Sequence, residues 1–175
     1  QDPAGIEHVR RNGLPEDHED FYDMHSQAAV SAFNLTCAPT KKGLSDANCP
    51  GLRVAAKNVK FGIPYGRGAA AIARQCREEG VDVTEDDAQI LIDDYFITYP
   101  HTHTFLAQCR ARVHNPGWVC NAFGRYRRFP TAREKSTIAE QERQAQNFPI
   151  QSLVADAMNL AITNLHSYRN EHPGV

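Results

Sequence analysis

The sequence predicts a mainly α-helical fold, with roughly seven helices and one small β-hairpin. Apolar residues recur every three or four positions through most of the 175 residues, which is the spacing of helices that bury one face. Signals for helix ends separate these segments: Gly80 ends one helix, a capping box of Thr84 and Asp87 starts the next, and Pro100 stops it. Residues 117–129 instead carry the aromatic and β-branched residues around a glycine that are typical of a short hairpin.

The composition is that of an ordinary globular domain. Hydrophobic residues make up 41% and charged residues 23% of the chain, and 175 residues are enough for one domain with a real core. No apolar run is long enough to span a membrane and the N-terminus lacks a signal-peptide pattern, so we expect no membrane partner. The five cysteines are scattered, with no C-x2-C spacing, which favours reduced thiols over a zinc site or a disulfide framework.

Basic residues are concentrated in two stretches, although the net charge is only −2. The total by itself argues against a nucleic-acid partner. Residues 53–77, however, contain six Lys or Arg and no acid, and residues 110–143 contain eight Lys or Arg against three Glu. Basic stripes on a nearly neutral protein still form an electrostatic footprint for nucleic acid.

The N-terminal third is expected to hold one helix between two irregular stretches. Residues 1–16 are polar and contain Pro and Gly, so they predict an irregular lead-in. Apolar residues at helical spacing predict a helix over 17–34, and a loop rich in Pro, Gly, Lys, Asp and Asn follows over 35–51.

Helices account for most of the remaining chain. Apolar periodicity predicts them over 50–62, from after Gly66 to about 79, over 84–99, over 104–114 and, after a lead-in over 140–151, to about 168. Asp93 and Asp94 are interpreted as an exposed face of the third of these helices, and Tyr95 as part of the core.

Four residues at the centre of the chain recur every four positions: Arg53, Lys57, Phe61 and Tyr65. In an α-helix such residues lie on one face, so this face carries two cations and then two aromatic rings. Cations suit phosphate oxygens and rings suit the flat faces of bases and sugars, which makes the row a candidate site for a nucleoside triphosphate. Gly62 and Pro64 weaken the helix near its end, so Tyr65 is expected at or beyond the break. Spacing alone leaves open that the row is a solvated helix edge beside a core edge.

The segment around this row resembles motif B, the O-helix, of family A DNA polymerases, the family of bacterial DNA polymerase I and many phage replicases. Every fixed place of the pattern R-x3-K-x3-F/Y-x3-Y-G is filled, by Arg53, Lys57, Phe61, Tyr65 and Gly66. Three further motifs resemble the same family, in family order, between about residues 20 and 168. They are D-x-H-x-x-x-A at 23–29, a hairpin ending in G-R-Y-R-R-F-P at 124–130, and N-x-P-x-Q at 147–151. The resemblance implies that residues 1–175 are a single fingers region with flanking pieces of palm.

For the incoming nucleotide, the resemblance implies five ligands. Arg53 and His25 would hold the γ- and β-phosphates. Lys57 would neutralise the triphosphate and act as the catalytic general acid that protonates the leaving pyrophosphate. Phe61 would pack on the sugar and base, and Tyr65 would stack near the templating base. An inward swing of the helix would close the site on a correct base pair.

For the DNA, the resemblance implies contacts from the end of motif B, the hairpin and the last helix. Gln151 would probe the minor groove of the terminal base pair, where all correct pairs present common acceptors. The other DNA contacts would come from Tyr65, Gly66, Arg125, Arg127, Arg128, Arg143 and Asn147. The chain departs from the family pattern at Cys120-Asn121-Ala122, which leaves the turn geometry open. It departs again at Ser152-Leu153, where the family usually has Gly-Thr and where the larger leucine is expected to shift helix packing.

Two catalytic motifs of the family have no counterpart among the 175 residues. The family uses two Mg²⁺ ions held by carboxylates of the motifs D-Y-S-x-x-E and H-D-E, and no segment here resembles either, nor a thumb or a 3′–5′ exonuclease. The resemblance therefore implies that the Mg²⁺ ligands lie outside this chain, on palm and thumb segments or chains that act as its partners. Primer–template DNA and dNTP are the other implied partners, and the chain alone is expected to be inactive. The implied location is the cytoplasm of a bacterial or phage-infected cell.

The predicted function is template-directed DNA synthesis, in which a nucleotidyl group passes from a dNTP to a primer 3′-hydroxyl and pyrophosphate is released. One alternative is a non-catalytic nucleic-acid-binding or regulatory helical module derived from a polymerase fingers domain. Another is a helical nucleotide-phosphate enzyme outside the polymerases. Intact Arg53, Lys57 and Phe61 favour the polymerase over the first alternative, because a binding-only module has no need for triphosphate ligands.

Overall fold

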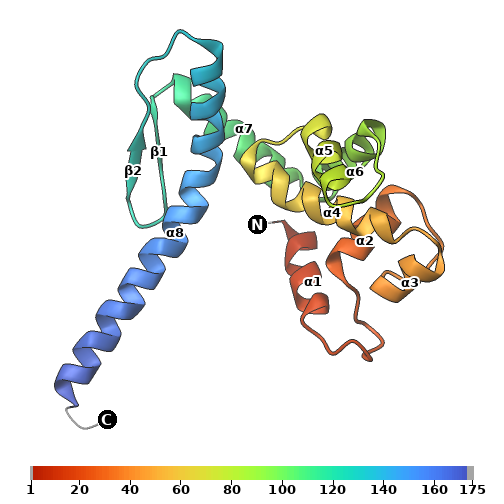
Figure 1. Cartoon of the computed structure of the whole chain (residues 1–175). Coiled ribbons are helices and arrows are strands. Elements are labelled where there is room, and N and C mark those ends of the chain that lie inside the picture. Colours follow the sequence, from red (N-terminus) through yellow and green to blue (C-terminus); the bar gives the residue numbers. More distant parts are fainter. Residues whose placement is uncertain (1, 173–175) are drawn as a thin grey trace. The chain divides into compact units, whose positions relative to one another are not determined.

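The computed structural model describes residues 2–172 and confirms a mainly helical fold with one small hairpin (Figure 1). The described residues form eight α-helices, one short 3-10 helix and one two-stranded antiparallel sheet. The chain divides into two units, residues 1–106 and residues 107–175. The assignment of residues 1–175 to a single fingers region stays a prediction.

The first unit is built around its fourth helix. In chain order it contains α1 (Pro3–Asn12), α2 (Met24–Ala32), α3 (Lys41–Asp46), α4 (Pro50–Gly62), the 3-10 helix η1 (Ile63–Tyr65), α5 (Ala69–Glu78) and α6 (Glu85–Thr98). Helix α4 packs against α2, α5 and α6 (Figure 1). One side of α4, with Ala55, Ala56 and Val59, is buried in the core that also contains Ile72 of α5 and Leu91 of α6. The residues on the opposite side of α4 are therefore not used by the core.

Helix α1 occupies residues that were expected to be irregular. Pro3 stands in its first turn, where a missing backbone N–H leaves no helical hydrogen bond unmade. The carboxylate of Asp2 holds this end by accepting hydrogen bonds from the backbone N–H groups of His101 and Thr102, both at 2.9 Å. The prediction was wrong because it took Pro3 as a helix breaker rather than as a helix start.

Capping side chains set the beginnings of α2 and α3. The first predicted helix starts later than expected, after Asp23, whose side chain accepts a hydrogen bond from the backbone N–H of Ser26 at 2.9 Å. Inside the first predicted loop, Thr40 caps the short helix α3 by accepting a hydrogen bond from the backbone N–H of Gly43 at 3.0 Å. In both places a local cap, rather than apolar spacing, decides where the helix begins.

The predicted limits of α6 are close to the observed ones. The capping box is present: Asp87 N–H donates to Thr84 Oγ1 and Thr84 N–H donates to an Asp87 carboxylate oxygen, both at 3.1 Å. Tyr95 packs against the core, as expected. The exposed position expected for Asp94 is wrong, because its carboxylate is half-buried and accepts a hydrogen bond from Ser31 Oγ of α2 at 3.0 Å. Burial raises the pKa of this carboxyl group.

The second unit is a hairpin on a long helix. It contains the end of α7 (Pro100–His114), β1 (Trp118–Cys120), β2 (Tyr126–Arg128) and α8 (Lys135–Glu171). The strands pair antiparallel with Val119 opposite Arg127, which confirms the predicted hairpin. A small core of Val113, Val119, Phe129 and Ala145 joins the hairpin to α7 and α8.

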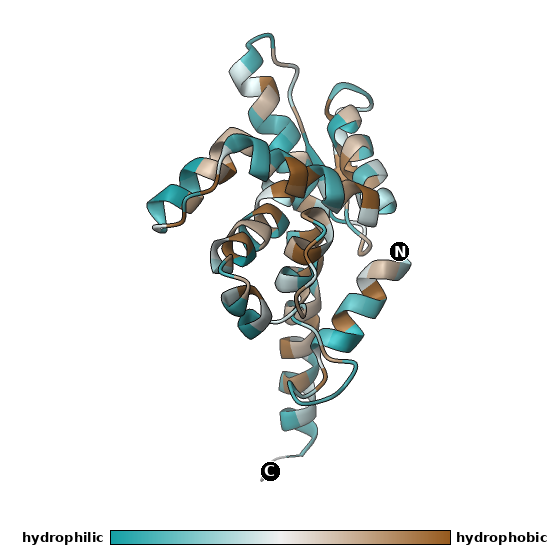
Figure 2. Ribbon diagram, turned by 90° about the vertical axis from the view of Figure 1, so that its right-hand side faces the viewer, coloured by the Kyte–Doolittle hydropathy of each residue, from teal (hydrophilic) through white to brown (hydrophobic). Residues whose placement is uncertain are grey.

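Helix α8 is longer than predicted. The sequence placed a lead-in over 140–151, but the helix is continuous from Lys135 to Glu171 and passes through the buried Pro149. Its later turns are exposed and include apolar residues. In Figure 2 the ribbon of these turns, leading to the C-terminus, alternates between brown and teal. Exposed apolar residues of this part are Val154, Met158, Leu160, Ile162 and Leu165. No helix in the described part of the chain has the length and hydropathy of a membrane span.

Candidate functional site

The predicted row of cations and rings lies along the side of α4 that the core does not use. Lys57 and Phe61 are exposed, and 59% of the Phe61 surface is open to solvent. Arg53, one turn before Lys57, is partly buried. Tyr65 lies in η1, beyond the end of α4, as Gly62 and Pro64 predict. The helix therefore presents a guanidinium, an ammonium and an aromatic ring on three successive turns.

The turn after Tyr65 depends on Gly66. This residue has a φ of +69°, in the left-handed region, and its backbone N–H donates to the carbonyl of Ile63 at 2.9 Å. A residue with a side chain is strained in that conformation, which accounts for glycine at this place. Gly66 thus redirects the chain from η1 towards α5.

His25 approaches this row from α2. Its ring centroid is 6.2 Å from that of Phe61. Burial lowers the pKa of His25, the negative charge of Asp23 opposes this, and the positive charge of Lys60 lowers the pKa further. Its Nδ1 atom is buried and has no hydrogen-bond partner among residues 2–172. An imidazole with one unsatisfied buried nitrogen therefore lies beside the row.

Arg53 makes an ion pair that the sequence analysis did not anticipate. Its Nε and Nη2 atoms donate to the two carboxylate oxygens of Asp23, each at 3.0 Å. Burial acts to raise the pKa of Asp23, but hydrogen bonds from Arg53 and Ser26 outweigh it and hold the pKa at about 2. No spacing rule could reveal this pair, because its members are thirty residues apart. Asp23 could have been noticed only as the first residue of the D-x-H pattern.

The three arginines of the hairpin have different surroundings. Arg125 is bound to Asp156 of α8, with its Nε atom 3.0 Å from both carboxylate oxygens and its Nη2 atom 2.5 Å from Oδ1. Arg127 donates from Nη2 to the side-chain oxygen of Gln144 at 2.5 Å. Arg128 is exposed. The guanidinium of Arg125 is thus used within the protein, whereas Arg128 points its charge to solvent.

The side chain of Asn121 sets the geometry of the hairpin turn, which the sequence left open. Its side-chain oxygen accepts hydrogen bonds from the backbone N–H groups of Phe123 and Arg125, both at 3.0 Å. Its amide nitrogen donates to Ser152 Oγ at 2.9 Å and to Asp156 Oδ2 at 2.7 Å. Asn121 and Ser152 are two of the positions at which the chain departs from the family pattern, and they contact each other. Sequence reasoning missed Asn121 because each departure was considered separately.

The predicted row on α8 lies on one continuous helix. Arg143 is exposed and pairs with Glu140, one turn earlier, through its Nε atom at 3.1 Å and its Nη2 atom at 2.5 Å. The side-chain nitrogen of Asn147 donates to the carbonyl of Arg143 at 3.1 Å. Gln151 is exposed. All three side chains therefore occupy successive turns of α8.

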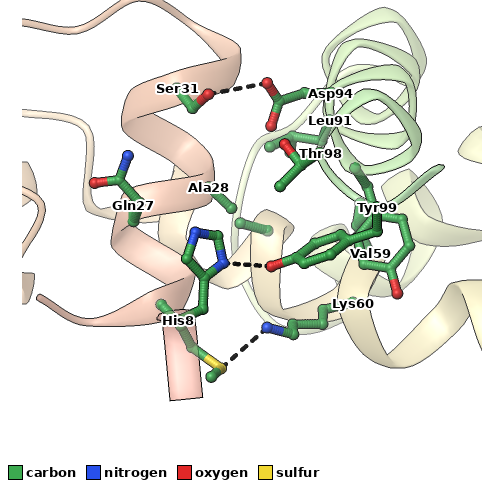
Figure 3. Close-up of a pocket in the computed structure, with 13 residues that line it drawn as sticks. His8, Gln27, Ala28, Ser31, Val59, Lys60, Leu91, Asp94, Thr98 and Tyr99 are labelled. Carbon is green, nitrogen blue, oxygen red and sulfur yellow. Dashed lines mark hydrogen bonds between the residues drawn. The ribbon is translucent and has the colours of Figure 1, made fainter. Parts of the chain in front are cut away.

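A cavity of about 70 Å³ lies on another side of α4 (Figure 3). Residues of α2, α4 and α6 form its walls, and His8 of α1 stands at its edge, with Nδ1 bonded to the hydroxyl of Tyr99 at 2.5 Å. The Lys60 ammonium is 3.1 Å from the sulfur of Met24, and burial lowers its pKa. None of the site residues predicted from the sequence lines this cavity.

The two-ion Mg²⁺ site that the resemblance implies does not fit the residues described. Within residues 2–172, no three His, Cys, Asp or Glu side chains come together in a way that could hold a metal ion. Asp23 is engaged by Arg53, Asp94 by Ser31 and Asp156 by Arg125. No metal-dependent step is therefore assigned to this part of the chain.

Comparison with known proteins shows the family to which this fold belongs. The model of the family described as DNA polymerase family A matches residues 9–173. The DNA polymerase of Escherichia phage T5 is 32% identical over 155 residues, which is 80% of this chain and 18% of the phage protein. A thermostable DNA polymerase I of Thermus filiformis is 33% identical over 145 residues, which is 82% of this chain and 16% of that protein. The chain thus spans less than a fifth of the length of these relatives.

A solved structure shows the same fold. It is described as the POL domain of Pol1 from M. smegmatis in complex with DNA primer–template and dNTP. Its TM-score is 0.65 at 24% identity, and the match covers 85% of this chain and 24% of that one. The two chains therefore share a mainly helical fold. The protein belongs to DNA polymerase family A.

Proposed function

We propose that the chain handles the incoming dNTP and the template strand in template-directed DNA synthesis. In that reaction the primer 3′-hydroxyl attacks the α-phosphate of a dNTP, the nucleotidyl group is transferred and pyrophosphate leaves. Membership of the family supports this reaction in general. Because the chain spans only 16–18% of these relatives, the full reaction is proposed to need further segments or chains.

The observation that carries the proposal is the arrangement on α4, with His25 beside it. A triphosphate laid along this helix would meet the Arg53 guanidinium and the Lys57 ammonium on successive turns, and the Phe61 ring one turn later. The unsatisfied Nδ1 atom of His25 offers a hydrogen bond to the same ligand. An ordinary solvated helix edge would not need an imidazole nitrogen that is buried without a partner.

Lys57 is proposed as the general acid. Its ammonium is exposed on the outer side of α4, where a bound pyrophosphate group can reach it. A lysine near a developing negative charge stabilises that charge and can donate a proton to the leaving group. Arg53 and His25 would bind the same phosphates without transferring a proton. Phe61 would pack against the sugar and base, and Tyr65 would lie near the templating base.

The template strand is proposed to contact α8 and the hairpin. Arg143, Asn147 and Gln151 occupy successive turns of α8, which suits a strand that follows the helix. Arg128 offers an exposed cation on the hairpin, and Arg127 lies beside it. Arg125 is assigned a structural role instead, since Asp156 already occupies its guanidinium. Palm and thumb segments carrying the two metal-binding motifs are the proposed partners, and bacterial or phage-infected cytoplasm is the proposed location.

The test is a titration of the chain into a fluorescein-labelled primer–template, followed by fluorescence anisotropy with and without the complementary dNTP. The expected result is that dNTP tightens DNA binding and that Lys57→Ala abolishes this effect. Lys135→Ala is the matched control, because Lys135 is also an exposed helix lysine but lies in the second unit. If dNTP does not change the affinity of the unchanged chain for DNA, the result would favour the non-catalytic binding module instead.

A further inference from the structure

The ion pair between Asp23 and Arg53 uses one particular edge of the guanidinium. The carboxylate oxygens accept from Nε and from Nη2, each at 3.0 Å, which is the side edge of the group. The side chains are mostly buried, with 24% of Arg53 and 13% of Asp23 exposed. A bidentate pair in such surroundings holds the guanidinium plane in one orientation.

The remaining donors of Arg53 lie on the other edge. A guanidinium has five N–H donors in a fixed fork, and the pair with Asp23 uses two of them. The three that remain are the two on Nη1 and one on Nη2; the remaining Nη2 donor and one Nη1 donor form the end edge of the group. This edge has the geometry that binds two oxygens of a phosphate. Asp23 and a phosphate therefore do not need the same donors.

Asp23 also fixes the helix that carries His25. Its Oδ1 atom accepts hydrogen bonds from the backbone N–H and the hydroxyl of Ser26, both at 2.9 Å, and so caps α2. The same oxygen accepts from Arg53 Nε. One carboxylate thus ties the start of α2 to α4, with His25 two residues away on α2.

We propose that Asp23 is a positioning residue for the triphosphate: it holds the side edge of Arg53 so that the end edge faces the γ-phosphate. This inference rests on the proposed function, because it needs a triphosphate on α4. It adds that the preference for a triphosphate over a diphosphate depends on a carboxylate that never touches the nucleotide. Asp23 lowers the freedom of Arg53 before the nucleotide arrives, so less conformational entropy is lost on binding.

The experiment compares Mg–dGTP with Mg–dGDP as probes, using the full chain on a primer–template with cytosine as the templating base. The measured quantity is the ratio of the two concentrations that half-saturate the anisotropy change. Asp23→Asn should lower this preference for dGTP about tenfold, because charge-assisted hydrogen bonds orient Arg53. Asparagine also caps helices, so α2 keeps its start. Arg53→Ala should lower the preference similarly, and the double variant should be no worse than Arg53→Ala alone.

The matched control is Glu7→Gln. Glu7 also makes a bidentate pair with an arginine of the same unit, Arg10, at 2.9 and 2.7 Å, but on exposed α1. This variant should keep the wild-type preference, and thermal unfolding by circular dichroism should show that all variants are folded. If Asp23→Asn keeps or increases the preference, the positioning role is overturned, and an increase would mean that Asp23 competes with the phosphate for Arg53. If the unchanged chain shows no preference for dGTP, the proposed function fails first, and this inference fails with it.

Discussion

The amide nitrogen of Asn121 donates a hydrogen bond of 2.9 Å to the hydroxyl oxygen of Ser152, thirty-one residues further along the chain. Both side chains are nearly buried, and the bond joins the tip of the hairpin to the turn of α8 that follows Gln151. Ser152 Oγ in turn donates to the carbonyl of Phe148 at 2.6 Å. The two departures from the family pattern therefore form one local structure, in which each residue supplies the partner of the other.

Asn121→Ala is expected to destabilise the second unit by about 1–3 kcal/mol, because the backbone N–H groups of Phe123 and Arg125 lose their acceptor and Ser152 Oγ loses a donor. Ser152→Ala should cost less, since alanine is a good helix former. The double variant should be less destabilised than the sum of the two, with a coupling of about 0.5–3 kcal/mol. Urea unfolding followed by the fluorescence of Trp118 measures all three. Additive effects would show that the two residues act independently.

Acid should weaken the first unit through Asp23. Its pKa in the folded chain is about 2, below the ordinary value of 3.8 for an aspartate side chain, so its contribution to stability is present above about pH 4 and is lost as the pH falls towards 2. The contribution at neutral pH is expected to be about 2 kcal/mol. Urea unfolding by circular dichroism at several pH values, for the unchanged chain and for Asp23→Asn, gives the difference. A difference that stays constant between pH 5 and pH 2 would contradict this prediction.

His25→Phe is expected to weaken nucleotide binding without lowering stability. The phenyl ring replaces a half-buried imidazole whose buried Nδ1 atom has no partner in the described part of the chain, so the free energy of unfolding should stay unchanged or rise by up to about 1 kcal/mol. The effect of dNTP on primer–template binding should fall about tenfold, because a phosphate loses a hydrogen bond. Thermal unfolding and anisotropy are the two measurements. A clear loss of stability would mean that Nδ1 has a structural partner after all.

Arg128→Ala should change DNA binding, whereas Arg125→Ala should change stability. Arg128 is exposed on the hairpin, so its removal should weaken DNA binding and reduce the slope of log affinity against log salt by about 1. Arg125 is bound to Asp156, so its removal should lower the thermal midpoint and change the salt slope little. Anisotropy titrations between 50 and 200 mM salt, on the order of the range used for such slopes, distinguish the two. If both variants change the slope of log affinity against log salt equally, Arg125 also contacts the DNA.

Helices α4, α5 and α6 could be predicted because local rules decide them. The capping box of Thr84 and Asp87 and the apolar side of α4 act within a few residues of sequence. The start of α2 and the existence of α1 were missed, because a polar cap or a first-turn proline outweighed the apolar spacing there. Pro149 was similarly misleading, since α8 continues through it and buries its ring.

The site could be predicted only as far as one helix carries it. Arg53, Lys57 and Phe61 were found because their spacing is regular on α4. The bond between Asp23 and Arg53 and the bond between Asn121 and Asp156 were missed, because each joins elements that are far apart in sequence. The spacing within one segment indicates which side chains share a helix face. It does not indicate which acidic side chain, far away in the sequence, forms hydrogen bonds with them.

Helix α1 contributes no buried residue to the first unit. Besides the contacts of the His8 ring with the rings of Tyr22 and Tyr99, its attachments are hydrogen bonds: Asp2 bonds Thr102 at one end, and Asn12 accepts a hydrogen bond from the backbone of Met24 at the other. Such bonds can be exchanged for bonds to water at little cost in free energy, so α1 should show the fastest amide hydrogen exchange of the helices around α4. We expect that release of α1 would admit water to the Lys60 side of the cavity while the packed core stays folded.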